Sequence, residues 1–267
     1  MMKRFIRRVT AFALSAMLLT APMAQAQELM TPEGAWLSVE IVVTLGDGSQ
    51  FGLRISYAEQ PVARGIADAL LIGSDFVGED QVCLVLGDNI FYAPTLGATL
   101  KRAVRRAEGA TVFGYWVEDP RPFGVVEFDD KGKAISIEEK PRYPKSNYIV
   151  PGLYFYDHQV MDIARNLKPS ARGELEITDV NLEYLRRGQL QVVPLERNFV
   201  WLDAGTADSL LEAGTTVKHI QDTSGHYVGC LEELGLYEGW ITEDQVRTMG
   251  KELSMTRYGK YLLSLIG

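Results

Sequence analysis

The chain has 267 residues, of which 46% are hydrophobic and 23% charged, and this suits one large globular α/β domain or two small ones. Its formal net charge of -8 argues against a nucleic-acid or anionic-membrane surface, so small molecules are the expected partners. The only two cysteines, Cys83 and Cys230, lie far apart in the sequence, which argues against a disulfide framework and a zinc site.

Residues 1–26 have the pattern of a secretory signal peptide. Basic residues from Lys3 to Arg8 precede an apolar run, and Ala24-Gln25-Ala26 has the small-x-small form of a cleavage site. The run is too short for a transmembrane span. This pattern predicts export, and the alternative is an amphipathic first helix of a cytoplasmic protein.

The next segments predict a strand at "VEIVVTLGDGS", a second at "FGLRISYAEQ" and a short helix at "ARGIADALLIGSDF". The stretch "QVCLVLGDNIFY" then holds a continuous apolar run, typical of a strand buried on both faces, that ends at Asp88. Ligands of open α/β sheets collect beyond the carboxyl ends of strands, so Asp88 is a candidate site residue. Gly-Asp-Asn is also ordinary turn chemistry, and this alternative stays open.

A helix predicted from Thr95 to Gly109 and a strand over 110–117 complete a crossover unit, which indicates parallel strands. A hairpin around Asp130-Lys131-Gly132 and a long strand "NYIVPGLYFYD" follow. We therefore predict a Rossmann-like α/β fold with a mixed, mostly parallel sheet flanked by helices. After a helix with Thr178 as its N-cap and strands "QLQVVPLE" and "FVWLDAGT", the segment 227–267 predicts short helices only.

Two carboxylates, Asp88 and Asp203, each stand where a predicted strand meets a loop. If they converge, they suit Mg²⁺, which takes one or two carboxylates together with substrate phosphate oxygens. The alternative is that both residues serve turns and helix caps.

Two further motifs are weaker. "ISIEEKP" ends a strand with Glu139 and Lys140, which could accept sugar hydroxyls and hold a phosphate, or could pair with neighbouring charges. "AEQPVARG" places Gln60 at a strand end and Gly65 before a helix. A Gln side chain can pair with a base edge and a glycine admits a flat ring, but a plain turn explains both.

Taken in order, the motifs "LGDGSQFGLRISYAEQP", "RGIADAL", "LVLGDNIFY", "PFGVVEFD", "ISIEEKP", "PKSNYIVPGLYFYD", "RGELEITDVN" and "WLDAGT" resemble those of the sugar-phosphate nucleotidyltransferases, most closely the thymidylyltransferases that act on glucose 1-phosphate. The resemblance runs from Leu45 to Gly267, with the core over 45–226.

The resemblance implies transfer of a thymidylyl group from dTTP to glucose 1-phosphate with Mg²⁺, in a cytoplasmic homotetramer. It implies that Asp88 and Asp203 hold the metal and that Gln60 and Gly65 contact thymine. The glucose pocket would be lined by Leu86, Phe123, Gly124, Glu139 and Val150. Lys140 and Arg172 would be the catalytic cations that grip the sugar phosphate.

The sequence departs from this family at its start. The family begins with a strand and a Gly-rich loop that cradles the triphosphate, but no Gly-x-Gly-Thr-Arg motif occurs here, and residues 27–44 are unmatched. Loss of one preorganised hydrogen-bond donor lowers the rate of catalysis by a factor of about 10² to 10³. The alternatives to an active enzyme are therefore a truncated, non-catalytic family member that binds sugar phosphate, and an exported interaction protein.

Overall fold

The computed structural model describes residues 45–106 and 108–267. Its chain divides into two compact units, and the division falls inside helix α9 (Ala207–Ser224). The first, here called the sheet unit, comprises the described residues from 57 to 213, and the second, here called the terminal unit, comprises residues 45–56 and 214–267. The signal-like segment 1–26, the unmatched segment 27–44 and most of the strand predicted at 39–49 lie outside the described residues.

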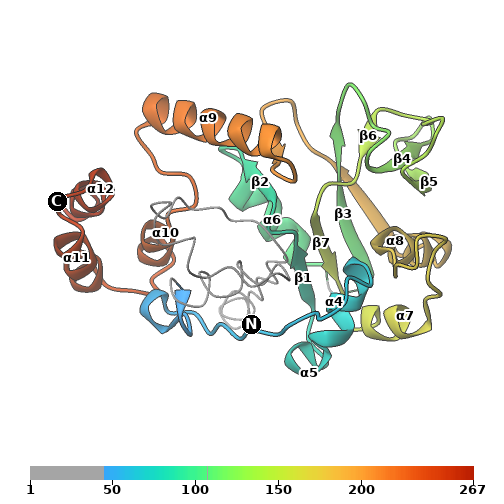
Figure 1. The fold of residues 1–267 in the computed structure, drawn as a ribbon, viewed down its shortest axis with the longest axis horizontal. Helices are drawn as coiled ribbons and strands as arrows, with labels where there is room; N and C mark the ends of the chain where they lie inside the picture. The colour runs from blue at the N-terminus through green and yellow to red at the C-terminus, as the bar shows by residue number, and fades with distance from the viewer. Residues whose placement is uncertain (1–44, 107) are drawn as a thin grey trace. The chain divides into compact units, whose positions relative to one another are not determined.

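A seven-stranded sheet is the centre of the sheet unit (Figure 1). Its strand order is β1, β7, β3, β6, β4, β5, with β8 beside β3. The strands are β1 (Val82–Val85), β3 (Ala110–Trp116), β4 (Gly124–Phe128), β5 (Ala134–Glu139), β6 (Tyr148–Ile149), β7 (Leu153–Tyr156) and β8 (Leu190–Pro194).

The sheet is mixed, as predicted, but its pairing is not mostly parallel. Among the described pairings of this sheet, β3 with β8 is parallel and the others are antiparallel. The crossover unit does give parallel strands β1 and β3, because both run antiparallel to β7. Strand β7, which comes later in the chain, lies between them. The order of the elements along the sequence does not predict this position of β7.

Alternating side chains of the central strands face two apolar clusters. Val82, Leu84, Tyr154 and Tyr156 pack against helices α4 (Ile66–Ile72), α5 (Ser74–Val77), α7 (Val160–Asn166) and α8 (Ile177–Arg186). Cys83, Leu153, Phe113 and Phe155 pack with helix α6 (Leu96–Val104). Because β1 contributes to both clusters, the prediction that it is covered on both faces is confirmed. Burial raises the pKa of the Cys83 thiol to about 12.

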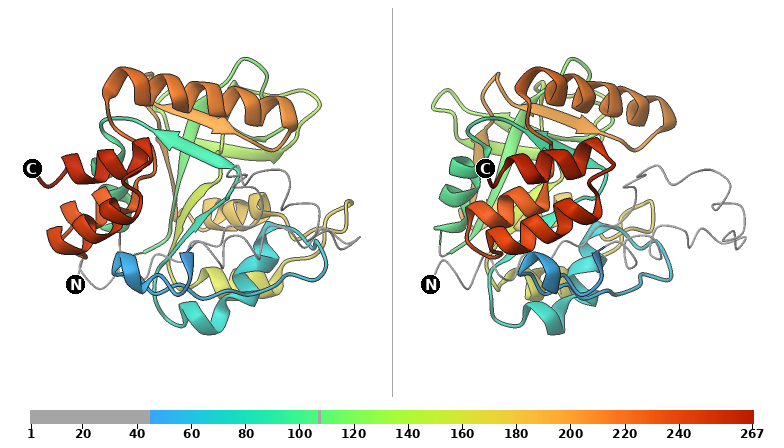
Figure 2. Two further views of the ribbon diagram at one scale, coloured as in Figure 1. Left: turned by 60° about the vertical axis from the view of Figure 1, so that its left-hand side comes forward. Right: turned by 90° about the vertical axis from the view of Figure 1, so that its left-hand side faces the viewer.

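A second, two-stranded sheet pairs β2 (Asn89–Tyr92) antiparallel with β9 (Val200–Asp203). These strands lie side by side in Figure 2, although more than a hundred residues separate them in the sequence. Asn89 is the register partner of Asp203, and Tyr92 that of Val200. This ladder joins the two predicted carboxylate positions.

Three sequence predictions about elements are wrong. Residues 53–60 form no strand, and the segment before them is a 3-10 turn, η1 (Ser49–Phe51). The predicted long strand is split into β6 and β7 at Pro151-Gly152, because proline lacks the N–H that a ladder needs. The N-cap of α8 is Glu176, and Thr178 lies inside the helix, where its hydroxyl donates to Glu139.

The terminal unit contains η1, the end of α9 and the helices α10 (Leu231–Tyr237), α11 (Glu243–Glu252) and α12 (Arg257–Ser264), which confirms the predicted helical C-terminal part. Cys230, Ile241, Val246 and Leu262 form its buried core. Thr242 caps α11 with a reciprocal Thr–Gln capping box, and Thr256 caps α12. Within residues 45–106 and 108–267, no helix is both long and apolar enough to cross a membrane.

Asp157, immediately after β7, is a buried carboxylate that ties three elements of the sheet unit together. It accepts hydrogen bonds from the Gly109 N–H at 2.6 Å, the Tyr184 hydroxyl at 2.7 Å and both the backbone and side-chain N–H groups of Gln159. Burial raises the pKa of this carboxyl, but the hydrogen bonds lower it by more, so the pKa lies below the ordinary value.

Replacing Asp157 by asparagine is expected to lower the free energy of unfolding by about 2 kcal/mol at neutral pH, because donors that now meet a carboxylate would meet an amide. A carboxyl group whose pKa is lower in the folded than in the unfolded state stabilises the fold. This stabilisation is complete above the pKa of the unfolded state, about 3.9, and is lost as the pH falls through the pKa of the folded state. Urea unfolding of the wild type and of Asp157→Asn should therefore show that the difference between their free energies of unfolding becomes smaller at acid pH. A difference that does not change with pH would contradict the role of the charge.

Candidate active site

Asp88 and Asp203 converge at one end of the β2–β9 ladder. Asp203 closes β9, and Asp88 directly precedes β2, where its carbonyl oxygen accepts from the Ala204 N–H at 2.8 Å. A methyl group built on Gly205 would lie 3.0 Å from Asp203 Oδ1 and 3.7 Å from Asp88 Oδ2, so both carboxylates face the same small space. The convergence that the sequence could only suggest is present.

The electrostatics of this pair are those of two like charges beside a cation. Burial raises the pKa of Asp203, the Gly205 N–H lowers it, Asp88 raises it further and the Lys140 ammonium lowers it, with a net shift upward. The repulsion between Asp88 and Asp203 favours a cation between them. Across the described residues, no group of three or more His, Cys, Asp or Glu side chains could hold a metal ion. Two carboxylates nevertheless fit Mg²⁺, which keeps several water molecules and binds substrate phosphates.

Asn89 fixes the position of Asp88 and was not singled out from the sequence. Its Nδ2 donates to Asp88 Oδ1 at 2.8 Å, while its Oδ1 accepts from the Gly152 N–H at 2.9 Å and from Trp201 Nε1 at 2.8 Å. These two donors determine which way the amide points, so the NH₂ group is directed at the carboxylate. The sequence motif "GDN" contained this residue, but its role depends on Trp201, which is 112 positions away.

The predicted sugar-pocket residues gather around the β4–β5 hairpin. Gly124 is the register partner of Glu139, and the N–H groups of Lys140 and Val150 donate to the carbonyls of Phe123 and Gly124. Leu86 joins them through Gly152, whose carbonyl accepts from the Leu86 N–H at 2.9 Å. Lys140 has φ 44°, an unusual left-handed conformation for a residue other than glycine.

An aromatic contact connects this group of residues to the carboxylate pair. The Phe123 and Trp201 rings meet edge to face with their centroids 5.3 Å apart, and Trp201 is the residue that holds Asn89. Tyr154 also lies within electrostatic reach of both Glu139 and Asp88, which raise its pKa in addition to the larger effect of burial. The two groups of side chains therefore lie near each other in the sheet unit.

Glu139 is held by Thr178, a second residue that the sequence did not assign to the site. The Thr178 hydroxyl donates to Glu139 Oε2 at 2.5 Å. A methyl group on Gly124 would come within 3.1 Å of the Thr178 hydroxyl and 3.3 Å of Glu139 Oε2, so glycine leaves the space beside this carboxylate open. The other carboxylate oxygen of Glu139, Oε1, lies 3.7 Å from the Arg172 guanidinium.

Arg172 lies beside Glu139 but is surrounded by carboxylates. Its guanidinium donates to Glu176 from Nη2, at 2.8 and 2.9 Å, and from Nε, at 3.1 Å, and it lies 3.3 Å from Glu174 and 3.7 Å from Glu139. In this arrangement the positive charge of Arg172 is already matched by acidic partners. Its predicted contact with a sugar phosphate requires an exchange of these partners and stays a prediction.

Gln60 and Gly65 form a separate group at the start of α4. Gln60 Nε2 donates to Asp68 at 2.8 Å and to the Gly65 carbonyl at 3.2 Å, so its amide oxygen is the group left to pair with a base. The loop that carries Arg172 contacts this group, because the Leu175 N–H donates to Arg64 and the Leu175 carbonyl accepts from Ala67. Contact with thymine stays a prediction for both residues.

Gly65 is required by backbone packing as well. Its φ is 97°, and a Cβ here would lie 2.4 Å from the Leu175 carbonyl oxygen. Gly65→Ala is expected to lower the free energy of unfolding by about 3 kcal/mol or more, because strain and a backbone clash add. Gly173→Ala is the matched control, since Gly173 also has positive φ but open space around it, and should cost about 1 kcal/mol. Equal decreases in the free energy of unfolding of Gly65→Ala and Gly173→Ala, measured by chemical denaturation, would contradict the clash.

Comparisons with known proteins identify the family of this chain. The family model described as Nucleotidyl transferase matches residues 26–219. The chain is 53% identical over 223 residues to a glucose-1-phosphate thymidylyltransferase of Neisseria gonorrhoeae, covering 84% of this chain and 77% of the relative. It is 55% identical over 222 residues to one of Mycolicibacterium smegmatis, covering 83% and 77%.

A solved structure supports the same fold. The chain superposes with a TM-score of 0.61 and 44% identity on a crystal structure assigned as a glucose-1-phosphate thymidylyltransferase of Bacillus anthracis in complex with a sucrose, over 68% of this chain and 73% of that one. The family match begins at residue 26, and the match to the Neisseria relative spans 223 residues, the length predicted for the resemblance from Leu45 to Gly267. The chain belongs to the nucleotidyl transferase family.

Proposed function

We propose that this chain is a glucose-1-phosphate thymidylyltransferase, which converts dTTP and glucose 1-phosphate to dTDP-glucose and pyrophosphate. The observation that carries this proposal is the connection, through Asn89, Trp201 and Phe123, between the Asp88–Asp203 pair and the residues around Glu139. A transferase that joins a sugar phosphate to a nucleotide needs both a hydroxyl-binding pocket and a centre for phosphate charge. The names of the relatives supply the choice of glucose 1-phosphate and a thymidine nucleotide.

Asp88 and Asp203 would hold Mg²⁺, which would neutralise phosphate charge and align the reacting groups when bound. Asn89 keeps the Asp88 carboxylate directed at this position. Lys140 stands close enough to lower the pKa of Asp203, and its ammonium would contact the sugar phosphate. Glu139, oriented by Thr178, would accept glucose hydroxyls.

The reaction itself is a single displacement. A phosphate oxygen of glucose 1-phosphate attacks the α-phosphorus of dTTP, the new P–O bond forms, and the bond to the bridging oxygen breaks to release pyrophosphate. The chain supplies alignment and positive charge, which is the usual division of labour in phosphoryl transfer. No covalent intermediate with a side chain is required.

The experiment that tests this function is a coupled assay of pyrophosphate release with dTTP, glucose 1-phosphate and Mg²⁺, repeated with each component omitted. We expect release only in the complete mixture. Replacing dTTP by UTP, and glucose 1-phosphate by galactose 1-phosphate, tests the substrate choice. Release that does not require the sugar phosphate would show hydrolysis of the nucleotide and would contradict a transferase.

The assembly and the location of the enzyme follow from the same proposal. A homotetramer, as the family resemblance implies, is a prediction that analytical ultracentrifugation of the full chain checks. The substrates dTTP and glucose 1-phosphate are cytoplasmic metabolites, so we place the reaction in the cytoplasm. Fractionation of cells that express the tagged full chain distinguishes this from export.

A further inference from the structure

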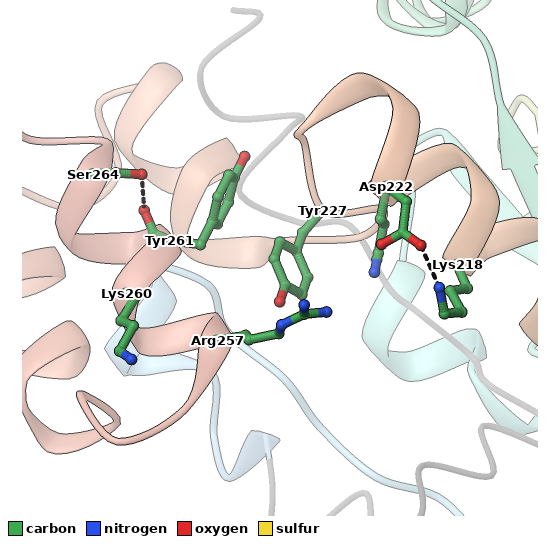
Figure 3. A pocket seen from close by; sticks show the side chains of 8 residues that line it. Lys218, Asp222, Tyr227, Arg257, Lys260, Tyr261 and Ser264 are labelled. Carbon is green, nitrogen blue, oxygen red and sulfur yellow. Dashed lines mark hydrogen bonds and ion pairs between the residues drawn. The ribbon is translucent and has the colours of Figure 1, made fainter.

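The terminal unit carries a hollow that the proposed reaction does not use. Its volume is about 510 Å³, and its lining comes from α9, α12 and the link after α9. Lys218 and Asp222 project from α9, Arg257 and Lys260 from α12, and the rings of Tyr227 and Tyr261 complete the wall (Figure 3). All these residues belong to one unit, so the hollow is defined within it.

The hollow is lined by three basic residues and one acidic residue, which gives it a net charge of +2. The whole chain, in contrast, has a net charge of -8. Lys218 pairs with Asp222, which is also attracted, more weakly, by Arg257. Lys260 makes no ion pair with any carboxylate in the part of the chain that the structure describes. Asp222 is therefore matched by Lys218, and the positive charge of Arg257 and Lys260 is left facing the hollow.

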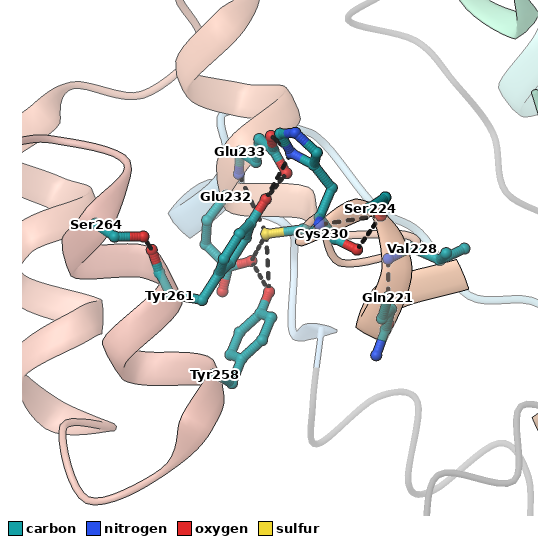
Figure 4. Close-up of polar contacts among 10 residues, drawn as sticks. Gln221, Ser224, Val228, Cys230, Glu232, Glu233, Tyr258, Tyr261 and Ser264 are labelled. Atoms are coloured by element: carbon teal, nitrogen blue, oxygen red, sulfur yellow. Dashed lines mark hydrogen bonds and ion pairs between the residues drawn. The ribbon is translucent and has the colours of Figure 1, made fainter. Parts of the chain in front are cut away.

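The aromatic wall is held rigidly. The Tyr227 ring lies 5.1 Å from the Tyr258 ring and 4.8 Å from the Tyr261 ring, centroid to centroid. The hydroxyls of Tyr258 and Tyr261 donate to Glu232 and Glu233, each at 2.5 Å (Figure 4). A wall fixed by such hydrogen bonds needs little reordering when a ligand binds.

We propose that this hollow binds a phosphate-bearing small molecule, with phosphate oxygens on Arg257 and Lys260 and the remainder along Tyr227. The guanidinium offers a planar fork of donors and the ammonium a compact charge, a pair that suits a group with several acceptor oxygens. The tyrosine ring provides an amphipathic surface for a base or a sugar. Nucleotides and inorganic polyphosphates share this phosphate chemistry.

Calorimetric titration of the full chain with inorganic pyrophosphate, and separately with ADP, tests the site. EDTA is present throughout, so that no divalent cation supports binding between Asp88 and Asp203. R257Q/K260Q is expected to bind each probe at least about tenfold more weakly, since charge-assisted hydrogen bonds are lost. R247Q/K251Q on α11 makes the same charge change away from the hollow and should bind as the wild type does. Circular dichroism confirms that each variant is folded.

Tighter binding of ADP than of pyrophosphate would support a nucleotide as the source of the phosphate, and equal binding would support a polyphosphate. Equal affinity of R257Q/K260Q and the wild type overturns the proposal, as does no binding to the wild type. If D203N loses binding and R257Q/K260Q does not, the probe binds at the active site, and this result also overturns the proposal. Pyrophosphate release by R257Q/K260Q with saturating substrates reports on the proposed function separately.

Discussion

Asp203→Asn is expected to lower the rate of pyrophosphate release by about 10³-fold or more. The asparagine oxygen can still accept from the Gly205 N–H, which now donates to Asp203 Oδ1 at 3.0 Å, so the end of β9 should keep its conformation. What is lost is one of two negative charges that face the same space. With one carboxylate remaining, the cation is held more weakly and phosphate charge is neutralised less well.

The measurement is the rate of pyrophosphate release as a function of Mg²⁺ concentration. Raising Mg²⁺ should recover part of the lost rate, because weakened metal binding is one component of the defect. Asp130→Asn, in the exposed turn between β4 and β5, removes the same charge and should leave the rate unchanged. Activity of the Asp203 variant within about tenfold of the wild type would contradict the metal role.

Lys140→Met is expected to reduce the same rate by about 10² to 10³. The methionine keeps much of the length and apolar character of the side chain but removes the ammonium. Lys140 follows β5 in a left-handed conformation, and its charge lowers the pKa of Asp203. The variant therefore loses both the cation that would meet the sugar phosphate and the neighbour that favours the ionised form of Asp203.

Lys133→Met is the matched control, since Lys133 is exposed near the other end of the same hairpin. The loss in Lys140→Met should fall mainly on kcat, because the charge that a cation stabilises grows toward the transition state. Thermal unfolding of the two variants should be alike. A change in KM for glucose 1-phosphate with kcat unaltered would instead limit Lys140 to holding the substrate.

Much of the site could be predicted because strand ends are visible in the sequence. The apolar runs before Asp88 and Asp203 indicated two strands that finish at carboxylates, and the structure brings those carboxylates together. The hairpin that carries Glu139 and Lys140 was likewise evident from alternation around a turn.

The partners of these residues could not be predicted because they come from distant segments. Asn89 was seen as part of a turn, and only the fold shows that Trp201 orients its amide. Thr178 looked like a helix cap, yet it lies within α8 and donates to Glu139. Arg172 was expected to be available for a phosphate, and the structure places it among three carboxylates.

The strand order was hidden for the same reason. A strand, helix, strand unit predicts that β1 and β3 run in the same direction, which they do. It gives no sign that β7, more than sixty residues after β1, enters between them and changes the pairing from parallel to antiparallel. Contacts of this kind depend on packing across the whole sheet and leave no local pattern.

The most direct test of the proposed function is to incubate the full chain with dTTP, glucose 1-phosphate and Mg²⁺ and to separate the products by anion-exchange chromatography with mass detection. An active thymidylyltransferase yields dTDP-glucose and pyrophosphate in equal amounts, and Asp203→Asn yields neither at a comparable rate. A folded wild-type protein that binds glucose 1-phosphate but forms no dTDP-glucose would contradict the account and support the non-catalytic alternative.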